Sequence, residues 1–431
     1  MNVEMIKAFF FFCVLYFFPQ FIDNMGLLLE QAFTIILFVL TFIYVCCYGF
    51  FNKKALLISF SYFFILLISL IRGADVFITG DFFELVKPLY FLSFYLFSFH
   101  YIKRYSEEKI DKLNNILSGF IYATFLLATL SILEAQSSFF NDIFNILYKE
   151  NRSVLQYKAV ASFISPYTFG SFLILPIFIS YFLISYNIKK IESFIFMIVF
   201  IFGMFSTQSR TTLISFCIAI AFSFFLILIC NWIKGRRKML LFTFFTLFSI
   251  LVSWSYLEEI LIERYSYLYN GLLTVFVNFD LDNIHSLIYS TPSISNRYEQ
   301  IIEVLEAQGD IPLIGAMIGK GEIYPESFYA MYLLRVGLLG LLAHLMLLVI
   351  GFFVSLKISY SLHLKSKFNM VPYFLGFSIY FISLFSSYFS SAVNDQTRTG
   401  FIFYSLLGLV FSLREKLKKD GDYFEFTKIN K

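Results

Sequence analysis

Apolar runs long enough to cross a bilayer recur along the whole chain, and this feature restricts its fold more than any other. A helix needs about 20 apolar residues to cross the hydrocarbon core of a membrane. Twelve such runs lie near residues 5–22, 32–51, 55–71, 82–99, 114–133, 161–186, 192–206, 211–231, 239–257, 327–356, 371–391 and 399–413. Of the 431 residues only 14% are charged, whereas soluble domains carry roughly 25%. The sequence predicts an all-α polytopic membrane protein with about 12 transmembrane helices, forming a single domain over residues 1–431.

Basic residues predict how these spans are oriented. When the N-terminus is placed in the cytoplasm, the cytoplasmic connections and the tail hold 22 of the 33 basic residues, in clusters such as Lys53–Lys54 and Arg236–Lys238. This distribution follows the positive-inside rule and predicts that both termini are cytoplasmic. The net charge of +4 is small and does not indicate nucleic acid as a partner.

The eleven basic residues on the predicted outer side differ in kind, because seven of them are arginine. These seven are Arg72, Arg152, Arg210, Arg264, Arg297, Arg335 and Arg398. A guanidinium offers a planar fork of donors that fits phosphate or carboxylate oxygens, and it keeps its charge. The set favours an outer cavity that binds phosphate. For each arginine taken alone, pairing with an outer acid such as Glu258 or Asp395 is the alternative.

The connection at about 258–327, between the ninth and tenth spans, is a loop of some seventy residues. Loops of this length are usually functional or disordered, and this one contains Ile, Leu, Tyr and Phe throughout. Segment 295–315 has the spacing of an amphipathic helix that lies on the bilayer or covers the bundle, with Asn296 as its N-cap. Arg297 would then lie in the first turn, beside free N–H groups that attract anions, or would be a solvated surface residue.

Metal signatures are weak in this chain. Asp280 and Asp282 in the long loop could hold a divalent cation beside a diphosphate, although two acids in a polar loop are common. His285 stands alone, and the chain has no Gly-rich phosphate loop and no paired-histidine metal motif. No metal or cofactor is predicted.

The order of these features resembles the O-antigen polymerase and O-antigen ligase superfamily of membrane glycosyltransferases. Proteins of that superfamily have ten to fourteen helices and a large periplasmic loop whose later part carries an arginine helix, a Pro–Gly element, a polar dyad and a helix with two glycines. The matching positions here are Arg297, Pro312, Gly315, Gly319, Glu326–Ser327, Gly337 and Gly340. The stretch TQSRTTLISF, residues 207–216, resembles a second element and places Arg210 at the outer mouth.

The resemblance implies a specific reaction. The growing glycan of an O-antigen would move from undecaprenyl diphosphate to the terminal sugar of a new lipid-linked repeat unit, on the periplasmic face of the bacterial inner membrane. Ligases of the superfamily usually have His–Asn where this chain has Glu326–Ser327, which favours the polymerase. The partners implied are lipid-linked oligosaccharide repeat units and membrane lipid, with a chain-length regulator and a flippase as further candidates.

This reaction needs cations at the diphosphate and a carboxylate that deprotonates the acceptor hydroxyl. We expect Arg210, Arg297 and Arg335 around the diphosphate, with Arg72 and Arg264 as further candidates, and Glu326 as base or as orienter of the acceptor. Glu326 could instead be an acid favoured at a helix start. Arg335 could instead pair structurally with an acid from another helix.

One geometric condition applies to the pair of Glu326 and Arg335. They are nine residues apart and would lie on opposite faces of an ideal helix. They can share a cavity if Glu326 precedes the helix, as Pro325 suggests. Elsewhere in the apolar runs, Glu84 and Lys87 could neutralise each other. His344 is expected to be a hydrogen-bonded core residue.

Three other functions remain as alternatives. An O-antigen ligase would share the donor, and a lipid-linked oligosaccharide flippase would be of similar size. A transporter of small anions would need charges near the midplane on discontinuous helices, which Arg335 and Lys87 loosely meet.

Overall fold

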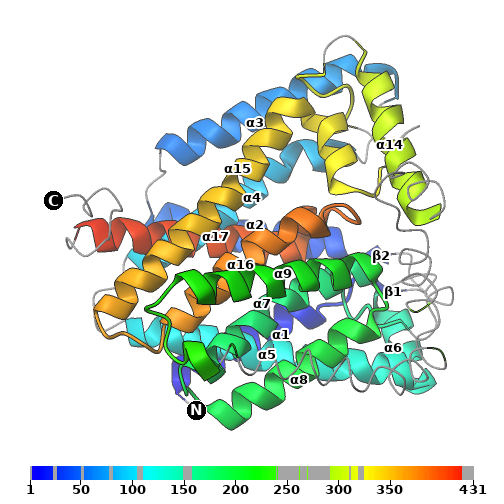
Figure 1. The fold of residues 1–431 in the computed structure, drawn as a ribbon. Coiled ribbons are helices and arrows are strands. Elements are labelled where there is room, and N and C mark those ends of the chain that lie inside the picture. Colours follow the sequence, from blue (N-terminus) through cyan, green and yellow to red (C-terminus); the bar gives the residue numbers. More distant parts are fainter. Residues whose placement is uncertain are drawn as a thin grey trace, which may run out of the picture.

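The computed structural model describes residues 2–22, 27–49, 53–76, 81–103, 110–148, 158–238, 292–309, 312–318 and 325–419, together with residues 240, 262 and 269. The described elements are α1 (Val3–Phe17), β1 (Phe21–Ile22), β2 (Leu27–Leu28), α2 (Leu29–Tyr48), α3 (Lys53–Arg72), η2 (Ala74–Val76), α4 (Asp81–Lys103), α5 (Ile110–Gln136), α6 (Ser138–Tyr148), α7 (Pro166–Ser185), α8 (Lys190–Ser206), α9 (Arg210–Ile229), α14 (Pro292–Gln308), α15 (Phe328–Leu364), α16 (Val371–Ser387), η6 (Val393–Asp395) and α17 (Thr397–Lys419). Figure 1 shows their arrangement.

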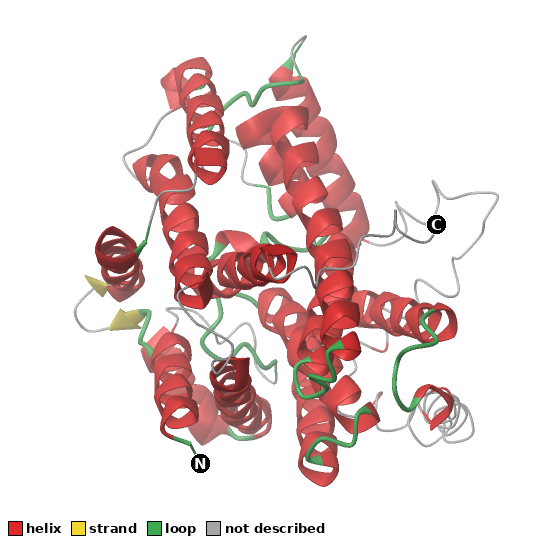
Figure 2. Cartoon of the chain, turned by 90° about the vertical axis from the view of Figure 1, so that its left-hand side faces the viewer, coloured by secondary structure: helices red, strands yellow, loops and turns green. Residues whose placement is uncertain are grey.

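The protein is a helical membrane protein. Within the described residues, seven helices are long and apolar enough to cross a bilayer, namely α2, α3, α4, α5, α7, α9 and α15. Eleven of the twelve predicted runs coincide with helices, and the run near 239–257 lies, except for residue 240, outside the described residues. Apart from helices, the described chain has a two-residue strand pair at the edge of the bundle (Figure 2). The number of spans and their orientation remain predictions.

Burial separates central helices from peripheral ones. In α7, 89% of the apolar window is buried inside the protein, whereas in α3 the figure is 11%. Helix α7 packs against α8 and α16, and α17 packs along α4. The apolar side chains of α3 therefore face mostly outward, as is expected where lipid replaces protein as the partner.

Helix α15 is interrupted inside its apolar run. Gly337 has φ of 67° and ψ of −172°, so the element consists of a short helix before it and a long helix after it. A Cβ added to Gly337 would lie 2.4 Å from the carbonyl oxygen of Leu313, a distance that real Cβ atoms do not adopt. Both the positive φ and this close approach explain why glycine occupies the position.

The segment that precedes α15 satisfies the backbone at the break. The N–H of Leu338 donates to the carbonyl of Pro312 (2.9 Å), and the N–H of Ala316 donates to the carbonyl of Leu334 (2.8 Å). Non-helical backbone within a membrane protein is tolerated where protein groups supply such partners. The Pro–Gly element and the glycine helix noted in the sequence are therefore two halves of one structural unit.

Helix α14 covers the start of α15, as one of the two predicted placements required (Figure 1). The predicted N-cap at Asn296 is wrong, because α14 already begins at Pro292. Its apolar residues are buried unequally, since Val304 is fully buried against Leu334 while Leu305 is 45% exposed. Arg297 consequently lies beyond the first turn, and the expected anion site at free helix N–H groups is lost there.

Lys234, one of the predicted cytoplasmic lysines, lies at the end of the bundle where α7 ends. The hydroxyl of Ser185 donates to the carbonyl of Lys234, whose ammonium lies 3.1 Å from the ring centroid of Phe368. These residues join the end of α7 to the connection between α15 and α16. The candidate site lies at the opposite ends of the same helices, near the start of α7 and of α15.

Candidate functional site

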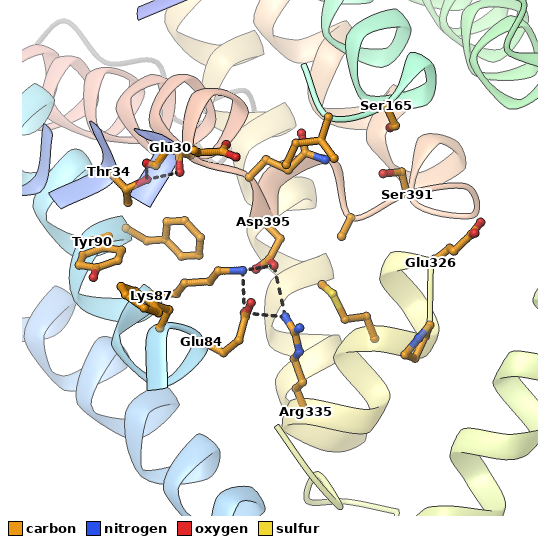
Figure 3. A pocket seen from close by; sticks show the side chains of 18 of the residues that line it. Glu30, Thr34, Glu84, Lys87, Tyr90, Ser165, Glu326, Arg335, Ser391 and Asp395 are labelled. Atoms are coloured by element: carbon orange, nitrogen blue, oxygen red, sulfur yellow. Dashed lines mark hydrogen bonds and ion pairs between the residues drawn. The ribbon is translucent and has the colours of Figure 1, made fainter. Parts of the chain in front are cut away.

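A cavity of about 550 Å³ opens between α2, α4, the starts of α7 and α15, and the segment that joins α16 to α17. Its size lies within the ~300–1,000 Å³ typical of small-molecule sites. Charged and hydroxyl side chains line it together with aromatic rings of α4 (Figure 3). Among the predicted site residues, Glu326 and Arg335 both line it.

Four charged side chains form a network inside this cavity, which we call the charge quartet: Glu84, Lys87, Arg335 and Asp395. Arg335 Nη1 donates to Glu84 Oε2 (2.9 Å) and to Asp395 Oδ2 (3.2 Å). Lys87 Nζ lies 2.6 Å from Glu84 Oε2 and also donates to Asp395 Oδ2. Each carboxylate thus bridges the two cations, and the four formal charges cancel (Figure 3).

Local sequence explains how three different elements build the quartet. Glu84 and Lys87 are three residues apart on α4 and so share one face of that helix. Arg335 lies two residues before the break of α15, and Asp395 ends the 3-10 turn η6 just before α17. The two sequence alternatives, mutual neutralisation of Glu84 with Lys87 and pairing of Arg335 with an acid of another helix, are both confirmed.

The ammonium of Lys87 is the quartet's more accessible cation. The side chain of Lys87 is 22% exposed, whereas that of Arg335 is 7% exposed. Lys87 therefore presents more charge to a ligand in the cavity than Arg335 does. The sequence signal for Lys87 as a cavity residue was its place inside an apolar run, three residues after Glu84 and directly before Pro88.

A second ion pair lies at the mouth of the cavity and joins two residues predicted for the site. Arg297 Nη2 donates to Glu326 Oε2 at 2.7 Å. The guanidinium also lies 5.7 Å from the ring centroid of Tyr167, which lines the cavity. Gln300, one turn further along α14, accepts from the backbone N–H of Glu326 (3.1 Å). The Glu326 side chain is 60% exposed and that of Arg297 only 16%, so the arginine is the more fixed member.

The geometric condition on Glu326 and Arg335 is met. Helix α15 begins at Phe328, so Glu326 precedes the helix, and Ser327 caps it by accepting from the Ala330 N–H (3.3 Å). Because Glu326 is outside the helix, it is not held on the face opposite Arg335. Ser327 has a structural role here as the cap.

The other predicted arginines lie elsewhere or outside the described chain. Arg72 donates to the carbonyls of Gln308, Ile314 and Gly315, so its guanidinium fastens the end of α14 and the Pro–Gly element to α3. Arg210 is the first residue of α9 and does not line the cavity. Arg264 lies outside the residues that the structure describes, as do Asp280, Asp282 and His285.

Lys158 lies close enough to Arg210 for the two positive charges to interact. Partial burial, and secondarily the positive charge of Arg210, lower the pKa of the Lys158 ammonium below its ordinary value. Two neighbouring positive charges repel each other, so an anion bound beside Lys158 and Arg210 would be favoured.

Arg398, one of the seven arginines predicted on the outer side, holds three backbone segments together. Its side chain donates to the carbonyls of Leu15 (3.0 Å), Ser162 (2.8 Å) and Phe18 (2.5 Å). These bonds tie the end of α1 and the segment before α7 to the start of α17. His344 is hydrogen bonded to the Tyr388 hydroxyl (2.9 Å) in the core, as predicted.

The hydroxyl and amide side chains of Ser165, Ser391 and Gln396 also line the cavity, and they surround the fully buried Thr168. Thr168 Oγ1 lies 3.2 Å from the Ser391 hydroxyl and accepts from Gln396 Nε2 (3.0 Å). The Ser165 hydroxyl caps α7 by accepting from the Thr168 N–H. On the far wall, Thr34 Oγ1 of α2 lies 2.6 Å from Thr397 Oγ1. Such groups both donate and accept, as the hydroxyls of a sugar do.

Within the described chain, no group of three or more His, Cys, Asp or Glu residues is arranged to hold a metal ion. Comparisons with protein-family models, with curated proteins and with solved structures gave no match. The assignment of a function therefore depends on the residues of this cavity and on the motif resemblance.

Proposed function

We propose that this protein is a membrane glycosyltransferase that polymerises a surface polysaccharide. It would move a glycan from a lipid diphosphate to the terminal sugar of a second lipid-linked unit, on the outer face of a bacterial inner membrane. The observation that carries the proposal is the pairing of Arg297 with Glu326 at the mouth of a polar cavity. A phosphate-binding cation and a carboxylate base are the two groups that such a transfer needs.

The pair gives each residue a role in the reaction. Phosphate oxygens compete with a carboxylate for the same guanidinium fork, so the donor's diphosphate takes Arg297 and releases Glu326. Glu326 then accepts the proton of the acceptor hydroxyl as that oxygen bonds to the anomeric carbon. The bond from the anomeric carbon to the diphosphate oxygen breaks, and the leaving diphosphate keeps the electron pair next to Arg297.

Replacement of these residues in a strain that lacks the wild-type gene tests the proposal. Loss of a general base typically lowers the rate by ~10²–10⁴, so Glu326→Gln should leave single repeat units on the surface glycolipid. Arg297→Ala should do the same, because a preorganised cation at the leaving group is of comparable value. The readout is a gel of surface glycolipid, with the lipid-linked pool analysed in parallel.

Lys367→Ala is the matched control, since this exposed lysine lies at the opposite end of the bundle between α15 and α16. It should leave the ladder of long polymers unchanged. Bare core with long polymer stranded on the lipid carrier would instead indicate a ligase. A normal ladder in both Arg297→Ala and Glu326→Gln would refute the proposed roles.

A lipid-linked oligosaccharide flippase is the second candidate. It is favoured by the break of α15 at Gly337, two residues after the buried Arg335, because transporters place charges on broken helices near the membrane midplane. The two candidates differ in where single units accumulate when the gene is deleted. Units trapped on the inner leaflet would favour the flippase, and units exposed on the outer leaflet would favour the polymerase.

A further inference from the structure

A second cavity of about 280 Å³ lies between α1, α4, α5 and α17, and Phe377 of α16 also lines it. We call this cavity the α1 crevice. It shares no lining residue with the candidate site. Among the described residues that line it, Glu4, Lys7, Ser98 and Ser405 are polar, and all the others are aliphatic or aromatic.

The packing of the helices explains why the α1 crevice is there. Helix α1 packs against α5, and α17 packs along α4, so the crevice separates two helix pairs (Figure 1). The pairs meet at three aromatic rings. Phe11 and Phe97 each face Phe401, with ring centroids 5.7 Å and 6.4 Å apart. From these rings the crevice extends towards the beginning of α1, where Glu4 and Lys7 line it.

The α1 crevice reaches the outer surface of the bundle. Phe11, which lines it, is 41% exposed, and the side chain of Lys7 is 69% exposed. Exposed apolar side chains on the outside of a helical membrane protein face lipid rather than water. A lipid can therefore enter the crevice from the side, without passing through the bundle.

Polarity changes along the α1 crevice in the way it does along a lipid. Glu4 and Lys7 lie in the first two turns of α1, and Phe11 and Phe12 follow. From Glu4 to Phe12 the helix rises by about 12 Å. This length is close to the ~15 Å of hydrocarbon in one leaflet, half the thickness of the core. A ligand that is charged at one end and apolar along the rest fits this arrangement.

The two charged residues of the α1 crevice suit a particular headgroup. Lys7 Nζ lies 3.8 Å from Glu4 Oε1, and the two side chains are 69% and 31% exposed. Such exposed pairs contribute little, so a headgroup can take their place with each other. A headgroup with a phosphate and an ammonium gives both residues a partner of opposite sign. A headgroup with a phosphate alone satisfies Lys7 but repels Glu4.

We propose that the α1 crevice binds one acyl chain of a phospholipid whose headgroup carries both a phosphate and a primary ammonium, as phosphatidylethanolamine does. Lys7 contacts the phosphate, and Glu4 contacts the ammonium. Because the beginning of α1 is predicted to be cytoplasmic, the lipid belongs to the inner leaflet. The proposal does not depend on the proposed function.

Photolabelling of the purified full-length protein in lipid nanodiscs tests the proposal. The probe is a phosphatidylethanolamine whose acyl chain carries a diazirine, and the adducts are located by mass spectrometry of peptides. Labelling of Phe11 and Phe97 should exceed that of Ile214, an apolar residue of α9 that is 47% exposed. Unlabelled phosphatidylethanolamine should compete roughly two- to fivefold better than phosphatidylglycerol, as one exposed charge contact implies.

Two variants move this preference in opposite directions. Glu4→Gln removes the partner of the ammonium, so the two lipids should compete equally. Lys7→Gln removes the partner of the phosphate and leaves phosphatidylglycerol facing Glu4 alone, so the preference for phosphatidylethanolamine should rise. Lys367→Gln is the matched control, because this exposed lysine lies between α15 and α16 and does not line the crevice. It should leave the preference unchanged.

Ser405→Phe tests the apolar part of the α1 crevice. The Ser405 hydroxyl has no hydrogen-bond partner within the described chain, so a phenyl ring there fills the crevice without breaking a hydrogen bond. Labelling of Phe11 and Phe97 should fall by about tenfold, because the ring displaces apolar contacts of the acyl chain. Ser405→Leu fills less of the space and should reduce labelling less. Melting curves in detergent show whether each variant is folded.

Four results would overturn the proposal. The first is labelling spread evenly over the exposed apolar residues, and the second is equal competition by the two lipids in the wild type. The third is full labelling in folded Ser405→Phe and Ser405→Leu. The fourth is a set of cross-links between two copies of α1 in place of lipid adducts, since a second copy would then cover the crevice. None of these results bears on Arg297 and Glu326, so the proposed function is tested separately.

Discussion

Arg335→Met gives the most direct test of the buried charge quartet. The side chains of Arg335, Glu84 and Asp395 are 7%, 8% and 11% exposed, so water screens these charges little. Methionine keeps much of the side-chain length but leaves two carboxylates facing the single ammonium of Lys87. Removal of one partner from a buried ion pair costs about 3–5 kcal/mol. The free energy of unfolding should fall by about that amount.

A compensating variant shows whether charge is the cause. Arg335→Met combined with Glu84→Gln leaves Lys87 and Asp395 as a neutral pair, so most of the lost stability should return. The assay is thermal or denaturant unfolding of the protein in detergent micelles, followed by intrinsic fluorescence. Arg72→Met is the control, because this exposed arginine donates to carbonyls and not to acids, and its loss should be smaller.

Two results would refute this reasoning about the quartet. The first is a single variant Arg335→Met that unfolds like the wild type. The second is a double variant that is no more stable than Arg335→Met, since restored neutrality would then contribute nothing.

Three further predictions follow from the geometry. Gly337→Ala places a Cβ 2.4 Å from the Leu313 carbonyl and forces a residue with a side chain to a φ of 67°, so it should lower the melting temperature by several degrees and lower yield; an unchanged melting curve would contradict the proposed break. Arg398→Ala removes three hydrogen bonds to buried carbonyls and should cost ~3 kcal/mol or more in unfolding experiments, against less than ~1 kcal/mol for the exposed Lys367→Ala. Because the pKa of Lys158 is lowered, the folded state releases this proton at a lower pH than the unfolded state does, and the free energy of unfolding should rise with pH from the lowered pKa up to the ordinary one. Lys158→Met should abolish that rise in melting curves recorded over a series of pH values. A rise that persists in the variant would belong to another group.

Two of the candidate site residues could be named from the sequence, although on different grounds. Glu326 was chosen because Glu326–Ser327 takes the place of the polar dyad in the superfamily that the chain resembles, and Arg297 because it also had a local signal, its place at the start of a helix with amphipathic spacing. Their direct contact had no such signal, because 29 residues separate them in the chain. The role of Arg297 was also inferred for a wrong reason, since α14 begins earlier than the N-cap pattern indicated.

Asp395 illustrates what the sequence could not decide. As one of the predicted outer acids it was one of several potential partners for any arginine. Only the tertiary structure places its carboxylate next to Lys87 of α4 and Arg335 of α15. Glu30 was overlooked altogether, since a single acid before an apolar run is ordinary. Its position on the cavity wall depends on how α2 packs beside α4.

The sequence by itself determined that this chain is a helical membrane protein. Its apolar runs are long enough to cross a bilayer, and a backbone inside lipid must satisfy its own hydrogen bonds, which an α-helix does within a single segment. It also indicated roughly where most of the described helices lie, although it placed the start of α14 at the wrong residue. The tertiary structure alone decided which charges neutralise one another and which face a cavity. Those choices depend on contacts such as that of Arg335 with Glu84, 251 residues away, and no local pattern encodes a contact at that separation.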